Sequence, residues 1–522
     1  MTDLPMNGAN ALIRTLLASG VDTTFMNPGT SEMHFVAALD DVPEMRGVLA
    51  LFEGVATGAA DGYARMAGRP AGVLLHLGPG LGNGLANLHN ARRAHTPVVN
   101  IVGDHATTHA QYDAPLQSDI ASIASSLEGW VRSATSPAAV AGDAAAAVHA
   151  AHGRPGQVAT LILPADVCWL PSSGPAEPLG IPAHTPVEAA RVAAVADVLR
   201  SGEPTAFLVG GTACLSGPLE SAGRVCAGTG AKLLAETFPA RLERGAGRVA
   251  AERLGYLAEF AQMQLDGLRH LVLVEAESPV SFFAYPDKAS DLVPQGCTVH
   301  VLTVPGEDSS AALAELADLV ADGAAPLFQA AGRPDRPTGA LDAETMANAI
   351  GALLPEGAIV ADEGNTTGLF VAGATAGAPP HDWLTLTGGA IGYGMPVATG
   401  AAVAAPGRKV LNLEADGSAM YTFQSLWTQV REGLDVTTVI LNNSSYAVLN
   451  MELARVGATA GGDRAKEMLD LRRPDMDFVA LARGMGVEQA SRATTAEDFT
   501  EQLEAALAME GPAVVEAMVP PL

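Results

Sequence analysis

Basic residues are scarce in this chain of 522 residues. Lys and Arg together number 30 against 57 Asp and Glu, which gives a formal net charge of −27. Such an acidic chain repels the phosphates of nucleic acids and the headgroups of anionic membranes. We therefore expect neither a nucleic acid nor a membrane as a partner. Any anionic cofactor must be held by local groups that act against the overall field.

Cysteines and long apolar runs are also few. The four cysteines, Cys168, Cys214, Cys226 and Cys297, are widely scattered and form no CxxC pair of the kind that binds zinc or exchanges disulfides. No window supplies about 18 uninterrupted apolar residues, and residues 1–5 lack the basic and apolar stretches of a signal peptide. These absences predict a cytoplasmic protein with reduced thiols.

Hydrophobic residues make up 48% of the chain and charged ones only 17%, so the chain can bury several cores. Proline and glycine cluster at 171–186 and 323–339, which predicts two linkers. These linkers delimit domains at 1–172, 187–325 and 340–522. Each segment alternates β-rich runs with helical patterns. This alternation indicates an α/β fold with three doubly wound parallel-sheet domains.

Individual elements are predicted where the hydrophobic periodicity and the turn residues are clear. The patterns predict helices at 11–18 and 54–66 and strands at 23–26, 48–51, 207–209, 410–413, 436–441 and 513–515. Thr494 and Glu497 have the spacing of a capping box before an apolar stripe. That stripe consists of Phe499, Leu503 and Leu507.

The first and third segments also resemble each other. A constant offset of 339 positions, without a gap, places Gly68-Arg69 on Gly407-Arg408 and Gly78 on Gly417. Both copies read as a Gly-Arg turn, a strand, a glycine loop, a helix and a second strand. The match predicts that the two segments share one βαβ plan.

The most specific motif follows the strand predicted at 410–413. Asp416-Gly417-Ser418 stands there, and 24 residues separate Gly417 from Asn442-Asn443 at the end of the next predicted strand. A carboxylate and an amide oxygen at neighbouring strand ends can converge on a hard cation. N–H groups at the start of the following helix can receive phosphate oxygens. The alternative is a capped helix and a strand-end turn, but the combination and its spacing favour a metal and phosphate site.

Here the sequence resembles the thiamine-diphosphate enzymes, whose Gly-Asp-Gly motif is followed by Asn-Asn at a similar spacing. The chain departs from that motif at Ala415, which replaces the first glycine. The resemblance implies three magnesium ligands: Asp416, the Asn443 side chain and the Ser445 carbonyl. It also implies that Gly417 allows close approach of the backbone, and that Ser418 and Tyr421 lie against the diphosphate. The expected cofactors are thiamine diphosphate and Mg²⁺.

The first segment carries a second mark of the same family. Glu53 precedes the run AADGYAR at 59–65 and resembles the essential glutamate of these enzymes. The resemblance implies that Glu53 hydrogen-bonds the aminopyrimidine ring and favours the tautomer that deprotonates the thiazolium carbon to a ylide. A glutamate that only complements a helix N-terminus is the alternative. The run that follows Glu53 favours the catalytic role.

The run GGAIGYGMP at 388–396 is similar to the family segment that bends the cofactor. The resemblance implies that Ile391 wedges between the two cofactor rings and that the Gly389 carbonyl accepts from the aminopyrimidine. Core packing is the alternative for Ile391. Asn365, in the loop at 362–367, is expected to border the cofactor. Because Glu53 and the metal site lie in different domains, the family architecture implies a homodimer or homotetramer with active sites between subunits.

Within the family, the loops at 27–32 and 75–83 resemble those of benzoylformate decarboxylases. The resemblance implies that the Thr30 hydroxyl meets the substrate carboxylate and that His76 relays protons. For His76, a strand-end histidine satisfied by backbone groups is the alternative. The resemblance implies a small-molecule 2-oxo acid as the substrate, without indicating which one.

The chain departs from that decarboxylase pattern in two places. The loop at 278–286 lacks the second histidine expected from the middle domain. His105 and His109 could compensate, although a surface role fits them equally well. Glu452 stands where a larger or apolar group is expected, which favours a polar or small acceptor, or a gate.

Together these features favour a thiamine-diphosphate- and Mg-dependent lyase that decarboxylates 2-oxo acids through a ylide and an enamine and releases an aldehyde. The nearest alternative is an acetolactate synthase-like carboligase that joins two 2-oxo acids, or a 2-oxo acid and an aldehyde. The middle segment lacks an arginine- and aspartate-rich stretch and a GxGxxG fingerprint, so we expect no FAD, and a nicotinamide dehydrogenase is disfavoured. The alternative from another class is a non-catalytic protein that only binds the cofactor. The presence of Glu53 argues against it, because such a protein does not need that carboxylate.

Overall fold

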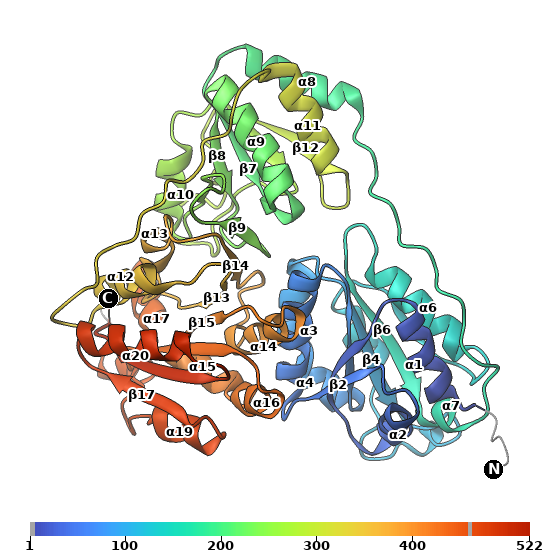
Figure 1. Ribbon diagram of the computed structural model, residues 1–522. Helices are drawn as coiled ribbons and strands as arrows, with labels where there is room; N and C mark the ends of the chain where they lie inside the picture. The colour runs from blue at the N-terminus through green and yellow to red at the C-terminus, as the bar shows by residue number, and fades with distance from the viewer. Residues whose placement is uncertain (1–5, 458–461, 522) are drawn as a thin grey trace.

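Three separate β-sheets organise the chain, and Figure 1 shows them in three lobes. The computed structural model describes residues 6–457 and 462–521. The first sheet has the order β2-β1-β3-β4-β6-β5, with strands β1 (Thr23–Asn27), β2 (Arg46–Leu49), β3 (Ala71–Leu75), β4 (Val98–Asp104), β5 (Val131–Ser133) and β6 (Val158–Pro164). Its helices are α1 (Gly8–Ala18), α2 (Met33–Asp41), α3 (Glu53–Ala67), α4 (Leu77–Arg93), α5 (Ile120–Ser125), α6 (Val140–Ala151) and α7 (Ala165–Trp169).

The second sheet forms the lobe drawn in green and yellow in Figure 1. Its order is β10-β8-β7-β11-β12, with strands β7 (Thr205–Val209), β8 (Lys232–Ala235), β10 (Glu252–Arg253), β11 (His270–Val274) and β12 (Thr298–Thr303). Its helices are α8 (Ala189–Arg200), α9 (Ser216–Thr229), α10 (Ala258–Leu265) and α11 (Ser309–Val320). The apolar sequence of β7 is buried along its whole length because neighbouring strands and helices cover it.

The third sheet has the order β17-β18-β16-β15-β13-β14-β9. Its strands are β13 (Ile359–Glu363), β14 (His381–Thr385), β15 (Val410–Ala415), β16 (Val436–Asn442), β17 (Gln489–Ala493) and β18 (Ala513–Met518), joined by β9 (Leu242–Arg244). Its helices are α12 (Ala343–Leu353), α13 (Val371–Ala374), α14 (Gly394–Ala404), α15 (Asp416–Thr422), α16 (Ser425–Glu432), α17 (Ala447–Arg455), α18 (Asp463–Glu467), α19 (Phe478–Gly484) and α20 (Ala496–Ala508). In the described parts of the chain, no helix combines the length and apolar character needed to cross a membrane.

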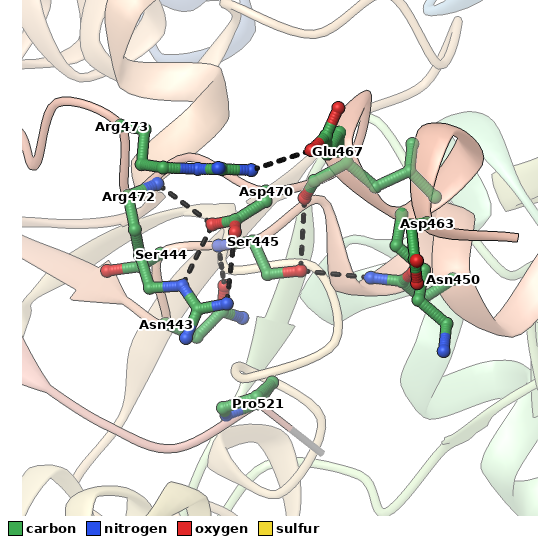
Figure 2. Close-up of a pocket in the computed structure, with 12 residues that line it drawn as sticks. Asn443, Ser444, Ser445, Asn450, Asp463, Glu467, Asp470, Arg472, Arg473 and Pro521 are labelled. Atoms are coloured by element: carbon green, nitrogen blue, oxygen red, sulfur yellow. Dashed lines mark hydrogen bonds and ion pairs between the residues drawn. The ribbon is translucent and has the colours of Figure 1, made fainter.

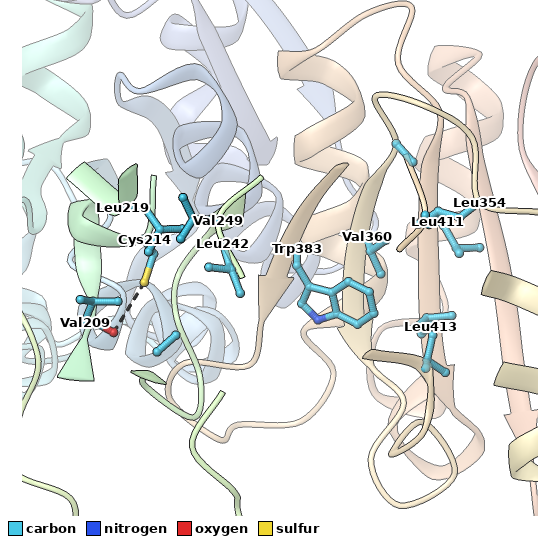
Figure 3. Packing of buried hydrophobic residues seen from close by; sticks show 14 of the residues in the cluster. Val209, Cys214, Leu219, Leu242, Val249, Leu354, Val360, Trp383, Leu411 and Leu413 are labelled. Carbon is cyan, nitrogen blue, oxygen red and sulfur yellow. Dashed lines mark hydrogen bonds between the residues drawn. The ribbon is translucent and has the colours of Figure 1, made fainter. Parts of the chain in front are cut away.

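The predicted α/β fold with three parallel-sheet domains is confirmed, with one antiparallel strand added. β9 comes from the middle segment of the chain and pairs antiparallel with β14 of the third sheet. The hydrophobic core follows this connection. Figure 3 shows Cys214, Leu219, Leu242 and Val249 on one side and Trp383 on the other, all within one buried cluster. The middle and third domains therefore share a continuous core.

All four cysteines are unpaired thiols, as expected. Burial raises the pKa of Cys168 and of Cys226 to about 12, so both remain protonated and unreactive near neutral pH.

The predicted elements fall close to the observed ones, with two corrections. The strand predicted at 48–51 is β2, which ends at Leu49 because the chain turns before Phe52, the N-cap of α3. The predicted capping box is wrong by one residue at its start. Thr495 caps α20 by accepting from the Asp498 N–H. Glu497 instead accepts from the Gly339 N–H, 2.9 Å from Oε2, and so closes the preceding linker onto the helix.

The internal repeat is confirmed by the structure. The offset of 339 positions places α3 on α14, β3 on β15, α4 on α15 and α16, and β4 on β16, each within a few residues. In both copies the two strands are parallel neighbours. Gly68 and Gly407, aligned by the offset, both adopt positive φ angles of 67° and 83°. The first and third domains therefore use the same βαβ unit.

Helices α3 and α14, which the repeat relates, pack directly against each other at the centre of the molecule (Figure 1). Glycines allow the two backbones to touch. A Cβ on Gly62 would lie 2.1 Å from the Val397 carbonyl oxygen, and a Cβ on Gly400 would lie 1.8 Å from the Ala59 carbonyl oxygen. The buried Arg65 guanidinium adds hydrogen bonds to the Thr385 carbonyl and the Tyr393 hydroxyl. This contact fixes the first domain against the third.

Substitution of Gly400 by alanine tests this packing. A methyl group cannot fit 1.8 Å from backbone, so the helices must move apart, which costs about 3 kcal/mol. We expect Gly400→Ala to lower Tm by about 6 °C in scanning calorimetry. Gly142→Ala is the matched control, since Gly142 lies in α6 with open space around it and alanine there favours the helix. Equal Tm values for the two variants would contradict the close contact.

Candidate active site

The predicted metal motif lies at the carboxyl ends of two neighbouring parallel strands. β15 leads into Asp416, the first residue of α15, and β16 leads into Asn442 and Asn443. The Asp416 carboxylate accepts from the Gly417 N–H through Oδ1 (2.8 Å) and from the Ser444 N–H through Oδ2 (2.6 Å). The second bond joins the two strand ends, so the structure brings Asp416 and the asparagine turn together as the spacing predicted.

The two adjacent asparagines have different partners. Asn442 Nδ2 donates to the buried Glu516 carboxylate at 2.7 Å, which anchors the turn in the sheet. Asn443 Nδ2 donates to Thr367 Oγ1 at 3.0 Å, and its Oδ1 accepts from the Ser445 N–H at 3.0 Å. Ser444 has a φ of 54°, in the left-handed region, which turns the chain sharply after Asn443. Asn442 is thus an anchor, and Asn443 faces the Asp416 side.

These donors fit a magnesium ion. Burial raises the pKa of Asp416 to about 6, and the backbone N–H groups that its carboxylate accepts from oppose this rise. A bound divalent cation would relieve that burial penalty. Among the described residues, no three His, Cys, Asp or Glu side chains gather as a metal site. The Asp416 carboxylate, the Asn443 amide and the Ser445 carbonyl are oxygen groups of the kind that a hard cation takes, and they would be its ligands if it bound here.

The residues predicted beside the diphosphate also converge. Asn365, with a φ of 47°, donates from Nδ2 to Ser418 Oγ at 3.2 Å. Tyr421 lies on α15 and is half exposed, and its Cβ would lie 2.5 Å from a Cβ on Gly392. Gly417 is packed under Tyr446, whose ring leaves no room for a side chain there. The N-terminus of α15 therefore brings together the Ser418 hydroxyl, the Asn365 amide and the Asp416 carboxylate.

The segment predicted to bend the cofactor is a short loop before α14. Gly389 has a φ of 74° and open space around it, and Ile391 is half-buried against a core that the first and third domains share. Glu363, at the end of β13, accepts from the N–H groups of Gly392, Tyr393 and Gly394 at 2.6–2.8 Å. The sequence contained Glu363 within the loop at 362–367 but gave no sign of this role.

Helix α4 holds the same loop from the other side. Asn87 donates to the Gly392 carbonyl at 3.1 Å, and Asn90 donates to the Ala390 carbonyl at 2.8 Å. One turn earlier, Asn83 donates to Glu53 Oε2 at 3.0 Å. Asparagines at 83, 87 and 90 follow helical spacing, so a polar face of α4 was readable from the sequence, although it was missed.

Glu53 is the first residue of α3 and is buried. Its carboxylate lies beside Gly80, where a Cβ would approach Oε1 to 3.2 Å. The Asn83 bond described above fixes its other oxygen. Glu53 is therefore held in one orientation at the edge of the first sheet. A carboxyl group that exchanges one hydrogen bond with a ligand would need to be held in this way.

His76 lies at the end of β3 and is paired with a residue that sequence reasoning missed. The buried Glu32 accepts at Oε2 from His76 Nδ1 (2.9 Å) and from the Gly29 N–H (2.7 Å). Ser31 Oγ bonds Glu32 Oε1 at 2.5 Å and lies 3.2 Å from His76 Nδ1. Thr30, predicted to meet the substrate, is exposed at the start of η1 (Thr30–Glu32). The loops at 27–32 and 75–83 are thus brought together.

The structure also places the three positions that the sequence left open, His105, His109 and Glu452. The His105 and His109 rings lie 5.4 Å apart between centroids, with their planes tilted by 51° to each other. Glu452, on α17, does not point to bulk solvent: its side chain is 16% exposed and lies 3.7 Å from Arg455 Nε. Its charge also raises the pKa of Tyr285, after the larger effect of burial, so Glu452 faces the middle domain.

A polar pocket of about 460 Å³ opens beside the turn at 443–445, and Figure 2 shows the residues that line it. Asn443, Ser444 and Ser445 form one side. A second side is formed by Asp470 and Arg472, which a bidentate ion pair joins. A third is formed by Asn450, which donates to Ser445 Oγ at 3.0 Å. The pocket is charged on both signs, which suits a polar group more than an apolar one.

The matches to known domain families cover both halves of this site. Residues 6–125 match the thiamine pyrophosphate enzyme, N-terminal TPP binding domain, and residues 364–517 match the corresponding C-terminal TPP binding domain. Thiamine pyrophosphate is the same compound as thiamine diphosphate. The chain therefore belongs to the thiamine-pyrophosphate-dependent enzyme family and contains its cofactor-binding domains.

Individual relatives align along nearly the whole chain. It is 61% identical over 518 residues to the "Putative acetolactate synthase large subunit IlvX" of Mycobacterium tuberculosis, covering 99% of this chain and 100% of that protein. It is 31% identical to the benzoylformate decarboxylase of Pseudomonas aeruginosa, with 97% and 98% covered. The structure of a 4-hydroxybenzoylformate decarboxylase of Rhodococcus jostii superposes with a TM-score of 0.86 at 23% identity, covering 98% and 99%, and confirms the fold.

Proposed function

We propose that this protein is a thiamine-diphosphate- and Mg-dependent carbon–carbon lyase that decarboxylates 2-oxo acids and releases aldehydes. The observation that carries the proposal is the buried Glu53, fixed by Asn83, in a chain that also keeps the Asp416–Asn443 turn. A protein that only bound the cofactor would have no need for a positioned carboxylate at the pyrimidine end. The 31% identity to a benzoylformate decarboxylase over the whole chain agrees with this reaction class.

The chain's own groups divide the work. Asp416, Asn443 and the Ser445 carbonyl would hold Mg²⁺, while Ser418 and the N–H groups of α15 receive the diphosphate. Ile391 and the Gly389 carbonyl, held by Glu363 and α4, would set the cofactor's bend. With the cofactor bound, the Glu53 carboxylate would hold a proton at the aminopyrimidine. When bound, thiamine diphosphate supplies the carbon nucleophile and the electron sink that decarboxylation of a 2-oxo acid requires.

His76 is the proposed proton relay toward the substrate, and Thr30 the proposed contact of its carboxylate. Because Glu32 accepts at His76 Nδ1, that nitrogen carries a proton, and Nε2 is left to face the reacting groups. Among the described residues, Nε2 has no hydrogen-bond partner. Glu32 thus fixes the tautomer that a relay needs.

Substitution of Glu32 tests this relay. In Glu32→Gln the acceptor of the Nδ1 proton loses its charge and stabilises this tautomer less, so we expect the rate of CO2 release to fall about 10- to 100-fold with KM little changed. Ser31→Ala removes a neighbour without changing the acceptor and should lose less. Steady-state kinetics on the best 2-oxo acid decide, and an unchanged rate in Glu32→Gln would remove His76 from proton transfer.

We further propose that the active site forms between two subunits of a homodimer or homotetramer. Glu53 belongs to the first domain and Asp416 to the third. Large apolar side chains beside both groups are exposed in the single chain: Leu51 is 46% exposed, and Met420 is 45% exposed. A second subunit would cover them. Sedimentation of the active enzyme should give a dimer or tetramer, and a fully active monomer would contradict this arrangement.

A carboligase is the second candidate, favoured by the name of the 61% identical relative and by the partly buried Glu452. Analysis of the products separates the two. Aliphatic and aromatic 2-oxo acids are incubated with the holoenzyme, with and without an aldehyde acceptor. We expect aldehydes as the main product under both conditions. A 2-hydroxy ketone or acetohydroxy acid as the main product would assign the carboligase, and no cofactor-dependent product would favour a binding protein.

A further inference from the structure

The sheet of the middle domain has a switch in strand order, which is the position where sheets of this kind bind nucleotides. In its sheet, β7 is flanked by β8 on one side and β11 on the other. From β7 the chain continues to β8 on one side, and it later returns to β11 on the other side. The carboxyl ends of β7 and β11 therefore lie at a switch in strand order. Phosphate-containing cofactors bind at such a switch, against N–H groups of the glycine loop that follows the first strand.

In this chain, two glutamate side chains already accept hydrogen bonds from the N–H groups of that loop. The loop after β7 is Gly210-Gly211-Thr212, at the start of η3 (Gly211–Cys214). Glu275, directly after β11, accepts from the Thr212 N–H at 2.9 Å and from Thr212 Oγ1 at 2.5 Å. Glu236, directly after β8, accepts from the Gly211 N–H at 3.3 Å. Ser309 Oγ, at the start of α11, is also bound to Glu275.

The two carboxyl groups lie as close to the loop as a ligand phosphate would. A Cβ on Gly211 would be 2.3 Å from Glu275 Oε2, and a Cβ on Gly210 would be 2.8 Å from Glu236 Oε1. Glu275 itself has a φ of 51°, a strained conformation for a non-glycine residue that aims its side chain back at the loop. Burial raises the pKa of Glu236 to about 8, so the two acids need not both be charged.

We propose that Glu275, with Glu236, occupies the phosphate position of the middle domain, so that this domain takes no flavin or nucleotide and serves as a structural joint. The proposal concerns the middle domain alone and does not depend on which reaction the thiamine site performs. A dinucleotide could enter only by displacing a carboxylate that holds three donors, and its own negative charge would meet that carboxylate.

Two measurements on the enzyme saturated with thiamine diphosphate and Mg²⁺ test the proposal. In the first, the purified protein is examined for flavin absorption and is titrated with FAD and with ADP in a calorimeter at up to millimolar concentrations. We expect no flavin and no binding of either compound. Flavin in the purified enzyme, or stoichiometric binding of FAD or ADP, would overturn the proposal whatever the catalytic activity.

In the second measurement, Glu275→Ala is compared with Glu277→Ala. Glu277 is 84% exposed, makes only a 3.6 Å ion pair with Arg93, and serves as the matched control. Loss of the Glu275 carboxylate leaves the Thr212 and Ser309 donors without their acceptor, so we expect Tm to fall by about 5 °C, against about 1 °C or less for Glu277→Ala. Equal Tm values for the two variants would overturn the structural role of Glu275.

Discussion

Glu53→Gln is expected to reduce thiamine-dependent CO2 release by at least about 100-fold while leaving cofactor affinity within a few-fold of wild type. The glutamine keeps the size of the side chain and can still accept from Asn83, but it cannot hold and return a proton at the aminopyrimidine. Rates are measured on the best 2-oxo acid, and affinity is measured by titration calorimetry with thiamine diphosphate in the presence of Mg²⁺.

Glu128→Gln is the matched control for this change, because Glu128 lies in the same domain with a side chain that is 70% exposed and pairs only with Arg92. Its rate should equal that of the wild type. A Glu53→Gln enzyme with wild-type turnover would show that the carboxylate is structural, and the proposed catalytic role would fall.

Asp416→Ala is expected to have a second large effect, which is on the affinity for the cofactor and not on turnover. The variant removes the one carboxylate of the metal site and the bond that joins the two strand ends. We expect thiamine diphosphate with Mg²⁺ to bind at least about 100-fold more weakly. In a thermal scan, addition of cofactor and Mg²⁺ should raise the Tm of the wild type, because ligands stabilise the state that binds them, and should leave the variant unchanged.

Two comparisons make the Asp416 result specific. Asp318→Asn changes an exposed carboxylate on α11 and should keep the full cofactor-dependent rise in Tm. Chelation of Mg²⁺ by EDTA should abolish the rise in the wild type and have no further effect in Asp416→Ala. If Asp416→Ala bound the cofactor as tightly as the wild type, the metal site would have to lie elsewhere.

The local spacing of residues predicted much of the fold and of the metal turn. Asp416 and Asn443 could be placed together because a βαβ unit puts the ends of adjacent parallel strands at one edge, and the structure joins them through Ser444. The repeat between the first and third domains was visible for the same reason. The capping box failed by one residue because Thr494 and Thr495 are adjacent, and only the tertiary contact of Glu497 with Gly339 decides between them.

Contacts between distant segments could not be read from spacing. Glu32 meets His76 because β1 and β3 are neighbours, 44 positions apart at these residues. Glu363 meets the loop before α14, and Glu275 meets the loop after β7, only once the sheets have formed. In each case the sequence shows an ordinary glutamate, and an N–H group on another segment gives it a role.

The acidic composition is compatible with the proposed anionic cofactor. The chain carries a formal charge of −27 and no basic cluster was expected at the diphosphate. The site instead offers a metal carboxylate, amide and hydroxyl groups, and backbone N–H groups at the start of α15. These local groups can bind a magnesium diphosphate, whose net charge is smaller than that of the diphosphate alone.

The most direct test of the central claim does not require the substrate. The C2 proton of thiamine diphosphate exchanges with deuterium, and the rate of exchange in the bound cofactor reports whether the protein activates it. It is measured by quenched-flow NMR on the wild type and on Glu53→Gln, both saturated with cofactor and Mg²⁺. We predict exchange several orders of magnitude faster in the wild type than in free cofactor, and close to the free rate in Glu53→Gln. Exchange in the wild type no faster than in solution would show that the protein binds thiamine diphosphate without activating it.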